Sequence, residues 1–169
     1  MAMRLFSSVA LALLLSGSLT GASAETPLPG AIAAPGETVV LSTHAQGSQV
    51  YVCKSNADGE LVWTFSEPLA ALTVDGRVVG RHYAGPTWEH IDGSAVVGKV
   101  AGSAPGAAAG DIAWLKLDVI SHRGNGVLTD VTTVQRIHTL GGKLEGVCEK
   151  AGNSLSMPYA ADYVFLRKG

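Results

Sequence analysis

Short runs of β-branched and aromatic residues, separated by glycine-containing turns about every ten residues, limit the fold of this chain more than any other feature. In "DIAWLKLDVI", Ala113, Leu115, Leu117 and Val119 fall on one side of an extended chain, and mostly polar residues fall on the other. This alternation is typical of a strand with one solvated face. No long stretch has the period of a helix. We therefore predict an all-β fold: an antiparallel β-sandwich or barrel-like single domain with long glycine-rich loops and at most one short helix.

Turn signals place some of the elements. Asp58-Gly59 is a turn dipeptide, and it predicts a hairpin between strands at 49–54 and 60–65. The segment "SEPLAAL", 66–72, is the best candidate for the one short helix, because Ser66 can cap it and Pro68 lies near its start. The low-complexity stretch 102–110 is predicted to be a loop.

The first residues have the layout of a secretory signal peptide: Arg4, an apolar run, and the small-residue pattern Ala22-Ser23-Ala24. We predict a signal peptide over 1–24, a proline-rich extended lead-in over 25–37 and a single β domain over 38–169. A transmembrane anchor is the alternative, but the apolar run falls short of about 18 residues. We expect the chain to be exported to the periplasm or the extracellular space, without membrane insertion after the signal is removed.

Two cysteines, Cys53 and Cys148, are present. An exported protein meets an oxidising environment, in which pairs of thiols tend to be bridged. We therefore predict a Cys53–Cys148 disulfide, with two separate buried thiols as the alternative. Metal binding through sulfur is not expected, because the chain has no C-x-x-C pair.

Charge and motifs exclude several classes of function. The chain has 12 basic and 14 acidic residues, and the basic ones are scattered, so neither nucleic acid nor an anionic membrane is an expected partner. The chain lacks a G-x-G-x-x-G after a strand, a P-loop, a G-x-S-x-G elbow and an H-E-x-x-H motif. These absences argue against nucleotide-dependent enzymes and serine hydrolases of the usual type, and they weigh against an enzyme without deciding the question. No cofactor is expected.

The densest polar run is "GRHYAGPTWEHIDGSAVVGK", 80–99. Aromatic faces on a rigid β scaffold can stack against sugar rings or flat apolar ligands, with nearby polar groups setting the orientation. We predict a binding module for a small-molecule or carbohydrate-like ligand. Its predicted site residues are His82, Tyr83, Trp88, Asp92 and Arg136.

Arg136 lies inside a strand pattern, and an inward Arg136 would need a carboxylate. Asp162 in the final strand is the predicted partner. Among the remaining tryptophans, Trp63 alternates with apolar residues and is predicted to be core, whereas Trp114 alternates with Lys116 and is predicted to be partly exposed.

Two other hypotheses remain open. His82 and His90 flank a Gly85-Pro86 turn that could bring them side by side, and Glu89 or Asp92 could then complete a metal site or act as a general base. That arrangement would make a metal-assisted or acid–base enzyme. The third hypothesis is an envelope or stress protein that acts through protein contacts and binds no ligand.

Three segments, taken together, resemble a known family: "GRHYAGPTWEHIDGSAVVGKV", "DIAWLKLDVISHRGNGVLTDVTTVQRIHTLGGKLEGVC" and "PYAADYVFL". The chain, from about Val50 to its C-terminus, is similar to the exported bacterial and fungal proteins grouped as domain of unknown function 3455. Cys53 and Cys148 fall at family-like positions, which supports their pairing. The family has no established activity, so the resemblance implies a fold and export but no reaction.

Overall fold

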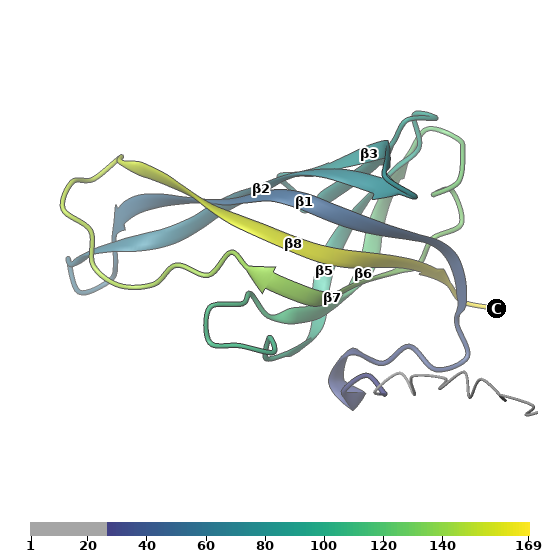
Figure 1. The fold of residues 1–169 in the computed structure, drawn as a ribbon, viewed down its shortest axis with the longest axis horizontal. Coiled ribbons are helices and arrows are strands. Elements are labelled where there is room, and N and C mark those ends of the chain that lie inside the picture. The colour runs from purple at the N-terminus through teal and green to yellow at the C-terminus, as the bar shows by residue number, and fades with distance from the viewer. Residues whose placement is uncertain (1–26) are drawn as a thin grey trace, which may run out of the picture.

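The computed structural model describes residues 27–169, and these residues form a closed antiparallel barrel of eight strands (Figure 1). Each strand pairs with the next along the chain, and β8 closes the ring on β1. The strands are β1 (Thr38–Ser55), β2 (Leu61–Val74), β3 (Arg77–Tyr83), β4 (Thr87–His90), β5 (Ala95–Ala104), β6 (Trp114–Arg123), β7 (Thr133–Gly141) and β8 (Ser154–Arg167). The predicted all-β class is confirmed, and the barrel is the form it takes. The predicted signal peptide, 1–24, lies outside the described residues.

The β1–β2 hairpin contains both predicted strands, with Tyr51 opposite Phe65 and Lys54 opposite Val62. The short helix predicted over 66–72 is wrong, because this segment continues β2 and pairs with β1. Pairing with a long neighbouring strand overrides a weak local helix preference. Pro68 is tolerated because β3 pairs with β2 only from Ala70 onward, so the missing N–H of Pro68 faces an unpaired edge.

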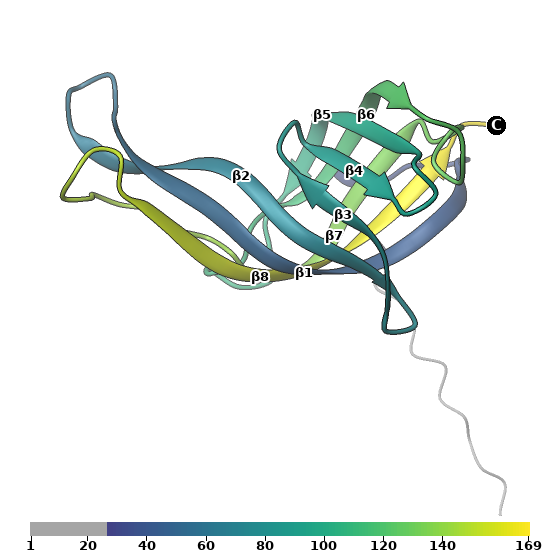
Figure 2. The ribbon, with the colours of Figure 1, turned by 90° about the horizontal axis from the view of Figure 1, so that it is seen from above.

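Three strands are much longer than the others and extend beyond the ring. In Figure 2, β1, β2 and β8 run on together as an arm, away from the short strands β3 to β7. Gly47 lies in the middle of β1, where a Cβ would overlap the backbone carbonyl of Leu69 and the Cα of Ala70. Glycine therefore allows the close approach of β1 and β2.

One end of the barrel is closed by the β6–β7 loop. Leu128 and Val131 in that loop are fully buried and belong to the main core, together with Val134 and Phe165 from the adjoining strands. This loop closes the end toward which β6 runs, so an opening can exist only at the other end of the barrel.

The segment that precedes β1 covers part of the outer wall. It contains one 3-10 turn, η1 (Gly30–Ile32), within the stretch predicted to be an extended lead-in. Ile32 is fully buried against Ala104 and Ile137, and Gln135 Nε2 donates a hydrogen bond of 2.6 Å to the Ile32 carbonyl. Residues 27–37 are thus packed on the domain rather than detached from it.

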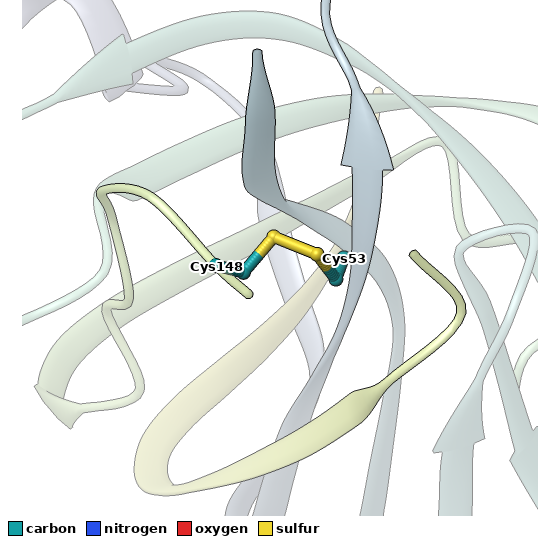
Figure 3. Close-up of a disulfide and its surroundings, with 2 residues drawn as sticks. All are labelled: Cys53 and Cys148. Carbon is teal, nitrogen blue, oxygen red and sulfur yellow. A yellow bond between two sulfur atoms is a disulfide. The ribbon is translucent and has the colours of Figure 1, made fainter. Parts of the chain in front are cut away.

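Cys53 in β1 and Cys148 in the β7–β8 loop form the predicted disulfide, with Cα atoms 5.9 Å apart (Figure 3). The loop around Cys148 also pairs with the start of β2: Trp63 N–H donates to the Gly146 carbonyl, and Cys148 N–H donates to the Leu61 carbonyl. The bond therefore fastens this loop to the arm.

Among residues 27–169, no helix has the length and apolar character needed to cross a bilayer.

Candidate functional site

A pocket of about 910 Å³ occupies the end of the barrel opposite the β6–β7 loop. Its wall combines the arm, the β3–β4 turn, the β5–β6 loop and the inward faces of β6, β7 and β8. It is lined by Gln49, Tyr51, Phe65, Ser66, Pro68, His82, Gly85, Pro86, Trp88, Val100, residues 105–109, Asp111, Ile112, Ala113, Leu115, Leu117, Arg136, Lys143 and Tyr163. A volume of this size is typical of small-molecule sites.

The pocket wall is mostly apolar. Leu115 and Leu117 alternate inward along β6, while Ala107, Ala108 and Ala109 line the mouth. Phe65 also lines the mouth with 48% of its surface exposed, and its ring contacts the ring of Tyr51 at 5.8 Å between centroids. Exposed apolar side chains gathered around a cavity are a feature of binding grooves.

His82 and Trp88 form one buried wall of the pocket. They are cross-strand partners on β3 and β4, and only 3% and 1% of their surfaces are exposed. His82 Nδ1 lies 2.8 Å from the Thr87 carbonyl oxygen. That oxygen can only accept, so Nδ1 carries the proton and the neutral ring presents a lone pair on Nε2. Burial lowers the pKa of His82 to about 3.

Arg136 brings a positive charge into the pocket from β7. Its Nε and Nη2 atoms donate to the Ala113 carbonyl at 3.0 and 2.8 Å, which fastens the β5–β6 loop to the barrel. The predicted partnership with Asp162 is wrong. Asp162 follows Ala161 and precedes Tyr163, which both face the core, so its own side chain lies on the outer face.

On that outer face, Asp162 contacts two histidines. Its carboxylate oxygens lie 2.9 Å from His44 Nδ1 and 2.9 Å from His138 Nδ1. The three residues come from β1, β7 and β8 and are 40–51% exposed at their side chains. Among the described residues, Arg136 forms no ion pair with any carboxylate.

Two tyrosines stand beside Arg136 in the interior. The hydroxyls of Tyr159 and Tyr163 are 3.4 Å apart. Burial raises the pKa of both phenols, and the nearby Arg136 charge acts in the opposite direction. Both groups therefore remain neutral hydroxyls that can donate or accept hydrogen bonds.

Two buried polar atoms of pocket-lining residues lack a hydrogen-bond partner. Trp88 Nε1 and Gln49 Nε2 are covered by neighbouring atoms, and neither has a hydrogen-bond partner of good geometry, although the Gln49 side chain lies close enough to the Tyr159 hydroxyl to lower the pKa of that phenol. Buried donors in native proteins are normally paired, and an unpaired one costs about 1–3 kcal/mol. Because both atoms have almost no exposed surface, a molecule in the pocket reaches them only when a neighbouring side chain moves.

Of the five predicted site residues, the structure brings His82, Trp88 and Arg136 to the pocket and places Tyr83 and Asp92 elsewhere. Tyr83 donates a 2.7 Å hydrogen bond to Glu89, which also accepts from Arg81 and Arg123. The hydrogen bond from Tyr83 is the main reason that the pKa of Glu89 lies below its usual value. This network lies outside the barrel.

Asp92 lies at the closed end, where it organises two loops. Its Oδ1 accepts from the Ser94 hydroxyl at 2.6 Å and the Ser94 N–H at 2.9 Å, and its Oδ2 accepts from the Val127 N–H at 2.8 Å. The hydrogen bond from the Ser94 hydroxyl is the largest of the effects that hold the pKa of Asp92 well below its usual range. This geometry gives Asp92 a structural role.

The two histidines of the metal-site hypothesis, His82 and His90, contact different residues in different parts of the barrel. His82 is stacked on Trp88 inside the barrel, and His90 Nδ1 lies 3.0 Å from Asp92 Oδ2. Within the described chain, no three or more His, Cys, Asp or Glu side chains are grouped so that they could hold a metal ion.

A family model described as "Protein of unknown function (DUF3455)" matches residues 34–167. The chain belongs to this family. The resemblance of the three sequence segments is thereby confirmed, and the match spans all eight strands and both cysteines of the disulfide. No curated protein matches the chain, and no solved structure does.

In this DUF3455 domain, seven polar or aromatic residues of the pocket were not predicted as site residues from the sequence: Gln49, Tyr51, Phe65, Ser66, Asp111, Lys143 and Tyr163. One signal for Gln49 was available. It shares a strand face with Tyr51 and Cys53, and a polar residue on an otherwise buried face is the informative exception. Tyr163 needs the register of the closed barrel, which places it opposite Arg136.

Proposed function

We propose that this protein is exported and binds a small, mainly apolar molecule in the open end of its barrel. The observation that carries the proposal is a large, mainly apolar pocket at the open end of the barrel. The disulfide supports export, because such bonds persist in oxidising compartments.

The interior width of an eight-stranded barrel supports a binding role. The interior of an eight-stranded barrel is just wide enough either to be filled by side chains or to hold one small ligand. In this protein the core side chains fill the end next to Leu128 and leave the other end open. Natural interiors are otherwise close-packed, so a cavity of this size is costly unless a ligand uses it.

The wall chemistry favours an apolar ligand over a sugar. Stacking on a sugar needs a free aromatic face, but Trp88 is stacked on His82 and meets the edges of Tyr163 and Phe165. The mouth presents Phe65 and several alanines. Of the predicted ligand classes, the small apolar molecule therefore has more support than the carbohydrate-like one.

Acid–base catalysis has less support. A histidine whose pKa is about 3 binds a proton only weakly near neutral pH, so His82 is a poor general base there. Glu89 is occupied by Tyr83, Arg81 and Arg123 on the outer face.

Titration with N-phenyl-1-naphthylamine, a neutral apolar fluorophore, tests the proposal. We expect saturable binding of one probe per chain. Val100→Trp should fill the mouth and weaken binding at least about tenfold, a change of roughly 1.4 kcal/mol. Lys99→Trp is the matched control, because Lys99 is exposed and does not line the pocket.

Two results would contradict the proposal. The first is the absence of saturable binding by the wild-type protein. The second is equal binding by the Val100→Trp and Lys99→Trp variants.

A further inference from the structure

The charges that line the pocket are unevenly matched. Lys143 lines the pocket, and its Nζ lies 3.2 Å from the carboxylate of Glu145, a residue that does not line the pocket. The carboxylate of Asp111 accepts from the backbone N–H groups of Ala108 at 2.9 Å and Gly141 at 2.7 Å. Arg136 is left without a carboxylate among the described residues. Among the described residues that line the pocket, Arg136 is therefore the cation without an ion-pair partner, and the carboxylate of Asp111 is a separate negative charge held by neutral N–H groups.

The donor set points to an acceptor group on the ligand. A guanidinium has five N–H donors, and Arg136 uses two of its nitrogens on the Ala113 carbonyl. Trp88 Nε1 and Gln49 Nε2 add N–H groups that have no partner. Both residues are at least nine-tenths buried, so these donors lie just under the pocket wall rather than in bulk solvent.

From these observations we infer that the ligand is an apolar molecule with a single carboxylate, which Arg136 binds and the N–H groups of Trp88 and Gln49 help to satisfy. The inference rests on the proposed binding function. A planar carboxylate matches the guanidinium fork. The N–H groups of Trp88 and Gln49 have almost no exposed surface, so they join the contact only when a side chain of the wall moves as the ligand binds. The pocket is lined by one arginine, and one carboxylate suffices to pair with it.

The test compares acids with alcohols of the same apolar body, by calorimetric titration near pH 7.5. The probes are octanoate against octan-1-ol, and 3-phenylpropanoate against 3-phenylpropan-1-ol. We expect the wild-type protein to bind at least one acid about tenfold or more tightly than its alcohol, as a charge-assisted hydrogen bond allows.

Variants assign that preference to named residues. Arg136→Met should bring the acid and alcohol affinities together while alcohol binding persists. Arg123→Met is the control, because Arg123 contacts Glu89 and Tyr83 on the outer face, and it should keep the preference. Gln49→Leu should weaken acid binding a few fold, because it removes an amide N–H that has no hydrogen-bond partner of good geometry in the free protein.

Each outcome decides one of the two ideas. If the alcohols bind as tightly as the acids, or if only the neutral fluorophore binds, the carboxylate inference is overturned and the binding function stands. If none of these probes binds, the proposed function fails as well. If Arg136→Met does not fold, Arg136→Gln takes its place, and an unchanged preference in that variant overturns the assignment.

Discussion

The imidazole of His82 lies flat on the indole of Trp88, with ring centroids 4.5 Å apart and ring planes 8° from parallel. The register of β3 and β4 places the two residues directly opposite each other. Tyr163 packs against both rings, at 5.0 Å from His82 and 5.4 Å from Trp88. This aromatic cluster forms a rigid wall that keeps His82 neutral and out of water.

The first prediction concerns the pH dependence of stability. Burial lowers the pKa of His82 from 6.5 to about 3 in the folded protein, so between these values the unfolded chain binds a proton that the folded chain does not. Below pH 6.5 this residue therefore makes the free energy of unfolding fall with decreasing pH, by up to about 1.4 kcal/mol per unit. Above pH 6.5 its contribution is fully present.

Urea unfolding of the wild type and His82→Gln between about pH 7 and pH 4.5 measures this effect. Subtracting the two curves removes the contribution of the carboxylates that both proteins share. We expect the variant to have the flatter dependence. Parallel curves would mean that His82 is protonated in the folded state at the lower pH.

A second prediction separates Asp92 from the pocket. Asp92→Ala removes the acceptor that ties the β4–β5 turn to the Val127 N–H, so the loop carrying Leu128 and Val131 should open more often. Hydrogen exchange of the amides from Val127 to Val131 should accelerate, while binding of the neutral fluorophore stays unchanged. Asp58→Ala, in the exposed β1–β2 turn, is the control for exchange. A loss of fluorophore binding in Asp92→Ala would instead connect Asp92 to the ligand site.

The strands, the hairpin and the disulfide could be predicted because they depend on local signals. Alternation along β6, the Asp58-Gly59 turn and an oxidising destination each suffice without knowledge of the whole fold. A closed barrel and a sandwich have the same alternation of inward and outward residues along their strands. The choice between them depends on whether β8 pairs with β1, and no local sequence pattern determines that pairing. The false helix over 66–72 has the same origin, since only the partner strand overrides its local preference.

The site was partly predictable for a related reason. His82 and Tyr83 are neighbours in one strand, and neighbours in a strand point to opposite faces, so only one of them can line an interior pocket. That rule applied to the sequence would have separated the two residues. The place of Asp92 could not be found in this way, because the Val127 N–H that ties it to the closed end belongs to a loop 35 residues further along the chain.

A third prediction tests the close contact between β1 and β2. Gly47→Ala places a methyl group against the backbone at Leu69 and Ala70, which cannot move aside as a flexible side chain can. We expect the free energy of unfolding to fall by roughly 1–3 kcal/mol, the range for overpacking, or by more. Gly30→Ala is the matched control, because its added methyl meets no atom within 4 Å. Equal stabilities by urea unfolding would contradict this account of Gly47.

The last prediction concerns the disulfide, whose loss should lower both the stability of the fold and the affinity of the pocket. Cys53 and Cys148 are 95 residues apart in the sequence, and in the chain-entropy model a bridge over so long a loop stabilises by roughly 4–5 kcal/mol. The double variant Cys53→Ala/Cys148→Ala should therefore lose about 2–5 kcal/mol in urea unfolding. Alanine is chosen because Cys53 is almost fully buried, where a serine hydroxyl would need a new partner.

The same variant should also weaken binding of the neutral fluorophore. The bond holds the β7–β8 loop to the arm, and that loop supplies Lys143 to the pocket wall and the Gly142 carbonyl that accepts from the Tyr51 hydroxyl at 2.8 Å. Without the bridge, Tyr51 and Phe65 lose a fixed neighbour at the mouth, so affinity should fall even under conditions where the barrel stays folded. Wild-type protein reduced with dithiothreitol should behave like the double variant. A double variant that is less stable but binds the fluorophore with unchanged affinity would limit the disulfide to stabilising the fold.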